Sequence, residues 1–374
     1  MPDAAPEGAT AGAAVGTPAE PTPGRRAIVG RALVLVGVVV FVFGIVLPRL
    51  VDYDAVRAAL AALTPGQLAL LAAASAVAYV ASAGTSRVLV PGLSWPHAVG
   101  SDLAARAVVT TVPGPTDVAT RFVLYRQWSI PTDVASAGIA LAGLFETLSY
   151  LAMPVIATAG ILVGDPAQPR ALLFALVGLI VLVAAAVLLA SIVRSESLAR
   201  KLGVWLDRMA QRIWRLLGKA PPTGIAESVV DLRERAKTML TRHGLRGFAA
   251  AVVAKLAWFA VLEAALWCVG IGPDVLPPSA VLAAMAVVGI VMLVPITPGG
   301  VGVAEVAYIG ILSSVAGPGM SDQLTAAVML FRIAQWLAPI PIGWVLLIVM
   351  RRGHWGERIW ASAPSPTSPS ASAP

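Results

Sequence analysis

Long apolar stretches separated by short polar segments make up most of this chain. A stretch of about twenty apolar residues is long enough to cross a bilayer as an α-helix. The continuous stretches are residues 27–47, 66–90, 133–163, 171–193, 247–270 and 323–350. The pattern therefore predicts an all-α, polytopic helical membrane protein, with its membrane domain over residues 25–352.

Two further apolar stretches, residues 98–132 and 279–316, are interrupted by proline and glycine. The interrupting residues are Pro113 and Gly114 in the first stretch and Pro298, Gly299, Gly300 and Gly302 in the second. Proline removes a backbone donor, and glycine adopts conformations that break a helix. A broken backbone at membrane depth is tolerated only where protein or a water-filled cavity satisfies it. We therefore expect two broken hairpins, each either re-entrant or crossing twice, and six to eight transmembrane helices in total.

Basic residues beside the apolar stretches predict the topology. Arg25 and Arg26 precede the first span, Arg351 and Arg352 follow the last, and Lys and Arg outnumber Asp and Glu in residues 194–246. Short loops rich in Lys and Arg stay on the cytoplasmic side. An even number of crossings must then separate these segments. We expect a multi-pass protein of the cytoplasmic membrane with both termini in the cytoplasm.

The order of elements suggests an internal repeat. Each half of the domain contains a span, a hairpin broken at Pro-Gly, and a second span, and the two halves have opposite predicted orientations. Inverted repeats of this kind are common in transporters, where broken helices meet at a midplane site. The alternative is coincidence, since the chain contains 34 Gly and 29 Pro. Both explanations stay open at this point.

The segments outside the membrane domain are of two kinds. Residues 1–24 and 353–374 are rich in Ala, Pro, Ser and Gly without periodicity, which predicts disordered tails. Within the cytoplasmic linker 194–246, residues 195–219 carry an apolar stripe and a basic stripe at helical spacing. This predicts an amphipathic helix lying on anionic lipid. The alternative is a loop helix that packs on the protein.

Composition agrees with a membrane protein and narrows its partners. The chain is 58% hydrophobic and 13% charged, which excludes an ordinary soluble domain. The net charge of +7 would suggest nucleic acid in a soluble protein, but these basic residues flank apolar spans. We therefore expect anionic lipid headgroups as partners and no nucleic acid. The single cysteine, Cys268, cannot form an internal disulfide.

Ionisable residues inside the predicted spans are the candidate site. They are Arg106, Asp117, Arg121, Glu146, Lys255, Glu263, Glu305 and Arg332. Each costs roughly 2.5–3.5 kcal/mol on insertion scales, so such residues are usually functional. The basic members suit a lipid phosphate, and the acidic members would balance their charge or meet an amine-bearing headgroup. The alternative is that they form buried ion pairs that only hold the hairpins together.

Spacing suggests how these charges pair. Asp117 and Arg121 are four residues apart and can pair along one helix. Lys255 and Glu263 are two turns apart and are expected to pair with other helices. Arg332 shares a helix face with Gln335, and Glu305 falls in the first helical turn after the second break, where a helix dipole favours an anion.

The second break carries the pattern P-G-G-x-G-x-x-E, from Pro298 to Glu305. With the overall plan of residues 27–352, it resembles the membrane region of the lysylphosphatidylglycerol synthase, or flippase-like, family. The segment from Pro113 to Arg121 is similar to an earlier element of that family, although Thr116 and Asp117 stand where a Gly-Glu pair is common. The full synthases add a soluble aminoacyl-transferase domain, for which residues 353–374 are too short. The resemblance therefore implies lipid handling without lipid aminoacylation.

Several chemistries find no motif in the sequence. There is no phosphate-binding loop of the G-x-x-x-x-G-K-[ST] type, no G-x-S-x-G elbow and no metal-ligand spacing around the three histidines. We expect no cofactor, no metal and no enzymatic activity. The predicted function is to translocate or present an anionic phospholipid or lipid-linked headgroup. The alternatives are a membrane-embedded lipid-modifying enzyme, or a non-transporting structural or regulatory partner of a membrane enzyme.

Overall fold

The computed structural model describes residues 63–112, 116–164, 194–216, 225–292 and 302–351, together with a few isolated positions. Within these ranges every regular element is helical. The elements are α4 (Pro65–Leu89), α5 (Trp95–Thr111), α6 (Thr116–Gln127), α7 (Thr132–Gly164), α9 (Glu196–Leu216), α10 (Ile225–Cys268), α11 (Pro278–Val291), α12 (Val303–Ala316), η3 (Pro318–Met320), α13 (Ser321–Arg332), η4 (Ile333–Leu337) and α14 (Pro339–Arg351).

Local sequence explains where the helices α4 and α5 begin. Thr64 caps α4 by accepting the N–H of Gln67, whose side chain in turn accepts the N–H of Thr64. Ser94 caps α5 in the same way, accepting the N–H of His97. Gly92 lies between the two helices at φ +84°, a conformation that glycine adopts without strain.

The predicted spans are confirmed where the structure describes them. Four helical segments are long and apolar enough to cross a membrane: Pro65–Leu89, Thr132–Gly160, Met239–Cys268 and Ser321–Met350. The last contains a π-helical turn, η4, before α14 continues. The helix α10 begins earlier than the predicted span because residues 225–246 contain no proline and extend it toward the linker.

Both predicted breaks are present. The first separates α5 from α6, and the second separates α11 from α12. The arms α11 and α12 have 14 residues each and thus a length of about 21 Å, which is short of a typical hydrocarbon core of about 30 Å. Gly300 and Gly302 have φ of +70° and +84°, so the second break needs glycine.

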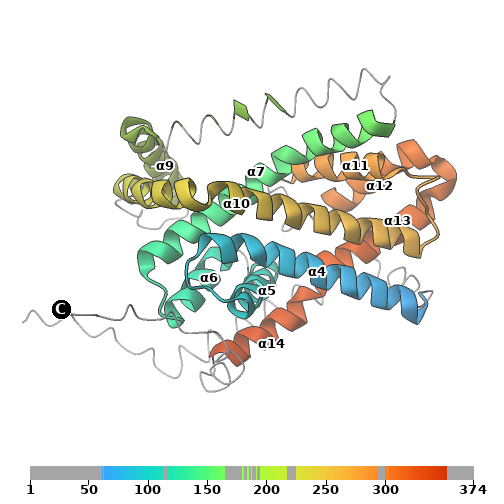
Figure 1. The fold of residues 1–374 in the computed structure, drawn as a ribbon, viewed down its shortest axis with the longest axis horizontal. Helices are drawn as coiled ribbons and strands as arrows, with labels where there is room; N and C mark the ends of the chain where they lie inside the picture. The colour runs from blue at the N-terminus through green and yellow to red at the C-terminus, as the bar shows by residue number, and fades with distance from the viewer. Residues whose placement is uncertain are drawn as a thin grey trace, which may run out of the picture.

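The helices α4 and α10 form the antiparallel centre of the domain (Figure 1). The amide nitrogen Nε2 of Gln67 donates to the carbonyl of Cys268 over 2.9 Å at one end. Midway along the pair, the rings of Tyr79 and Trp258 meet edge to face, with 5.1 Å between their centroids. A large apolar core surrounds this crossing and continues into α11, α12 and α13.

The two hairpins pack in a corresponding way. The first arm of the first hairpin, α5, lies against α14, and a side chain at Gly343 would collide with the backbone of Leu103. The first arm of the second hairpin, α11, lies against α7, and a side chain at Gly289 would collide with the ring of Tyr150. Each first arm thus packs on the last span of the other half, as related halves would.

Some predictions concern residues outside the described ranges. These are the first span 27–47, most of the span 171–193, both tails, and the break residues Pro113, Gly114, Pro298 and Gly299.

Candidate functional site

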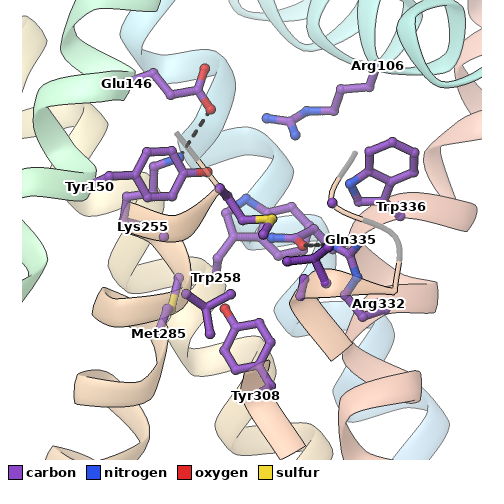
Figure 2. A pocket seen from close by; sticks show the side chains of 16 residues that line it. Arg106, Glu146, Tyr150, Lys255, Trp258, Met285, Tyr308, Arg332, Gln335 and Trp336 are labelled. Atoms are coloured by element: carbon purple, nitrogen blue, oxygen red, sulfur yellow. Dashed lines mark hydrogen bonds and ion pairs between the residues drawn. The ribbon is translucent and has the colours of Figure 1, made fainter. Parts of the chain in front are cut away.

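A cavity of about 340 Å³, here called the central cavity, lies between the second hairpin and the spans around it. Figure 2 shows Arg106, Glu146 and Lys255 on one side of it and Arg332 with Trp336 on another. The helices α5, α7, α10, α11 and α12 all contribute lining residues, as do α13 and η4. Residues far apart in sequence therefore meet in one polar space inside an apolar domain.

The second hairpin is tied to the next helix by a buried ion pair. The Nε of Arg332 donates to Oε1 of Glu305 over 2.6 Å, and both side chains are nearly buried. The other carboxylate oxygen of Glu305 accepts the backbone N–H of Gly302 at 2.7 Å. Glu305 thus caps α12 as predicted, and its charge holds Arg332 at the cavity wall.

The turn after Arg332 presents further polar groups to the cavity. Nη1 of Arg332 donates to the side-chain oxygen of Gln335 over 3.1 Å, and its guanidinium lies 5.5 Å from the ring centroid of Trp336. Gln335 and Trp336 lie in η4. In the same turn, the backbone carbonyl of Ala334 accepts the hydroxyl of Tyr79. π-helical turns often mark functional sites because they re-aim side chains. The predicted shared face of Arg332 and Gln335 is confirmed.

Lys255 occupies the opposite wall of the central cavity. Its Nζ donates to Oε1 of Glu146 on α7 over 3.1 Å and lies 3.7 Å from the ring centroid of Tyr150 (Figure 2). The side chain of Glu146 is still 53% exposed, whereas that of Lys255 is 8% exposed. As predicted, Lys255 pairs with another helix and not with Glu263.

The first hairpin contains a different cluster around Asp102. Its two carboxylate oxygens accept Nε of Arg106 at 2.7 Å and Nη2 of Arg121 at 2.6 Å. The expected pair between Asp117 and Arg121 is therefore wrong. Asp102 is on α5 and Arg121 is on α6, so the folding of the hairpin brings Arg121 to Asp102. The deeply buried carboxylate of Asp102 therefore binds one arginine with each of its oxygens.

A smaller cavity of about 90 Å³, here called the side cavity, lies beside the first hairpin. Arg106, Glu146 and Lys255 line both cavities, whereas Asp117 and Arg121 line only the side cavity. Among the described residues, Arg106 uses only its Nε in a side-chain ion pair. Its guanidinium points into the central cavity in Figure 2, so its terminal nitrogens can reach a bound group.

The structure brings together seven of the eight candidate charges. Six line the two cavities, and Glu305 binds Arg332 directly behind the central one. Glu263 on α10 lines neither cavity, and its Oε1 has no partner among the described groups. The site residues that sequence reasoning missed are Asp102, Tyr150, Trp258 and Tyr308. The i, i+4 spacings of Asp102 with Arg106 and of Glu146 with Tyr150 could have indicated two of them.

Three basic side chains, Arg106, Lys255 and Arg332, line the central cavity together with one acid, Glu146. Each of these cations is held in an ion pair, with Asp102, Glu146 and Glu305 respectively. Guanidinium and ammonium groups are the side chains that bind phosphate in proteins. No cluster of three potential metal ligands occurs in the part of the chain that the structure describes. The lining thus combines cations with aromatic rings.

One protein-family model covers most of the chain. The model of the lysylphosphatidylglycerol synthase transmembrane region matches residues 32–343. The chain belongs to this family. No curated protein matches it significantly. Together with the long apolar helices, membership identifies a multi-pass membrane protein from a family related to lipid handling.

Proposed function

We propose that this family member moves the headgroup of an anionic phospholipid, or of a lipid-linked sugar phosphate, across the cytoplasmic membrane. The observation that carries the proposal is the central cavity, where basic side chains from α5, α10 and α13 converge with a single lining acid. A headgroup phosphate would bind there while the acyl chains stay in lipid. Binding needs no cofactor or metal, and the chain acts as a transporter without catalysing a reaction.

The mechanism we propose uses the two hairpins as re-entrant gates from opposite sides of the membrane. The corresponding packing of α5 on α14 and α11 on α7 supports an inverted repeat. In this mechanism the two halves move about the crossing of α4 and α10, at Tyr79 and Trp258. The movement exposes the central cavity to each side of the membrane in turn. A gradient, the membrane potential or mass action would drive the net movement.

Labelling tests the repeat. Single cysteines at Gly114 and Gly299, in a Cys268→Ala background, should react with impermeant thiol reagents from opposite sides. The proposal expects a substrate headgroup to protect both. Labelling from opposite faces at shallow depth, with no protection by the headgroup, would overturn the inverted repeat.

Headgroup translocation in proteoliposomes tests the function itself. Purified protein should move fluorescent phosphatidylglycerol faster than a zwitterionic lipid. Arg106→Gln should lower the rate at least tenfold, because it removes the cation whose terminal nitrogens face the cavity while Asp102 keeps Arg121. Arg242→Gln, an exposed change on α10, is the matched control and should keep the wild-type rate.

Other outcomes separate the alternatives. Equal rates for wild type and Arg106→Gln would place the route outside the central cavity. Conversion of the lipid into a new product would indicate an enzyme. Folded protein that moves neither the phospholipid nor a lipid-linked sugar would favour a role in presenting lipid to a membrane-enzyme partner.

A further inference from the structure

The helix α9 lies outside the group of spans and packs against the N-terminal part of α10 (Figure 1). The buried guanidinium of Arg233 on α10 donates to the backbone carbonyl of Arg194 just before α9, which fixes the start of the helix. The same α10 enters its apolar segment at Met239. The helix α9 is therefore held close to the place where α10 enters the membrane.

One stripe of α9 faces the protein. Gly203 is buried, and Asp207 and Gln211, one and two turns later, are half-buried. At about 100° per residue these three positions fall on one side of the helix. This stripe accounts for the contact with α10.

The apolar stripe points the other way. Leu198, Trp205 and Met209 are 38%, 55% and 38% exposed, and on the same helical projection they lie opposite Gly203 and Gln211. Large apolar side chains on a face that α10 cannot reach need another apolar partner. The expected amphipathic helix is present, and the alternative of packing on the protein holds only for its opposite side, which contacts α10.

Two basic side chains border the apolar stripe on one side, since Lys201 and Arg208 lie next to Trp205 on the same projection. They line an open groove on α9 with Val204, Trp205 and Arg200, of which Arg200 lies on the side of the protein-facing stripe. Tryptophan beside Lys and Arg is typical of helices that lie at a membrane surface, with rings at headgroup level and cations on anionic lipid. Charge and apolarity on adjacent faces fit a lipid surface better than a protein.

We propose that α9 is a docking helix for anionic phospholipids of the leaflet at which α10 enters the membrane. Leu198, Trp205 and Met209 enter the boundary between headgroups and acyl chains, and Lys201 and Arg208 bind the phosphates. The surface is separate from the central cavity and does not depend on translocation. Each cation near such a surface strengthens binding about fivefold.

Fluorescence quenching by brominated lipids tests the docking. Full-length protein with Met209→Cys and Cys268→Ala would carry an environment-sensitive dye at position 209, in liposomes of phosphatidylcholine with or without brominated phosphatidylglycerol. We expect quenching that saturates as phosphatidylglycerol increases and weakens at high salt, because screening acts on exposed charges. Replacing Lys201 and Arg208 by Gln should raise the half-saturating fraction at least tenfold.

Matched variants sharpen the result. Arg208→Lys keeps the charge and should retain the wild-type response. Arg200→Gln, on the protein-facing side of α9, is the matched control and should also retain it.

Three results would overturn the proposal. Equal quenching by brominated phosphatidylcholine alone would show insertion without selection for anionic lipid. A dye that is shielded from an aqueous quencher and is not quenched by brominated lipid would show that a protein covers the stripe. An unchanged response in the double Gln variant would exclude the basic residues.

Discussion

The two broken hairpins both use buried ion pairs, but they use them for different connections. In the first, Asp102 on α5 binds Arg121 on α6, so the acid joins the two arms of one hairpin. In the second, Glu305 on α12 binds Arg332 on α13, so the acid joins the hairpin to the following helix. The first cluster therefore fixes a hairpin internally, and the second fixes how a hairpin sits beside the cavity.

The clusters also differ in their ratio of charges. Asp102 is 4% exposed and holds two guanidinium groups, Arg106 and Arg121, whereas Glu305 holds Arg332 together with the N–H of Gly302. Removing a buried acid leaves its partners with uncompensated charge. The loss should be greater where two cations depend on one carboxylate. Two similar breaks in the sequence therefore differ in how much their buried acids contribute to stability.

The largest expected effect follows from this difference. Asp102→Asn should destabilise the protein by about 3–5 kcal/mol, the range for breaking a buried pair. Glu305→Gln should cost less, about 1–3 kcal/mol, because only one cation, Arg332, loses its carboxylate partner there. Unfolding by denaturant in detergent micelles measures both, with Asp117→Asn in the first hairpin as the control. A larger loss of unfolding free energy for Glu305→Gln than for Asp102→Asn would contradict this order.

A smaller effect is expected at the backbone of the second break. Gly302→Ala should cost about 1–2 kcal/mol, because a β-carbon is strained at φ +84° although nothing crowds it. Gly310→Ala on α12 is the matched control, since a β-carbon there meets open space at an ordinary helical φ. The same unfolding assay compares the two. Equal stability of both variants would mean that the break relaxes to another conformation.

The smallest effect concerns the pair that both cavities share. The coupling between Glu146 and Lys255 should stay below about 1 kcal/mol, because Glu146 is 53% exposed and opens onto both cavities, so protein does not enclose the pair. A double-mutant cycle with Glu146→Gln and Lys255→Met measures this coupling. A value above 2 kcal/mol would mean that the pair is a structural element comparable to the two hairpin clusters.

Much of the fold could be predicted because it depends on local signals. The spans at Pro65–Leu89 and Thr132–Gly160 follow directly from apolar length, and the second break follows from glycine and proline. The amphipathic pattern of residues 195–219 likewise predicted α9. Neighbouring residues determine these features, so they can be predicted without knowing how the helices pack.

Pairing of the charges could be predicted only in part. Arg121 had an acid four residues away, yet its partner is Asp102, which is 19 residues away. Local spacing cannot reveal such a contact because it depends on how the arms of the hairpin fold together. The same reason explains why Trp258 and Tyr308 were missed as residues of the site.

The sequence by itself determined the membrane class, the positions of the described spans and breaks, and the set of costly intramembrane charges, because apolar length, helix breakers and desolvation act locally. Only the tertiary structure decided that Arg106, Lys255 and Arg332 share one cavity while Glu263 does not. That decision comes from the antiparallel crossing of α4 and α10 and from the packing of each hairpin on the other half. Contacts between distant segments select which buried charges meet, and a single helix cannot encode that choice.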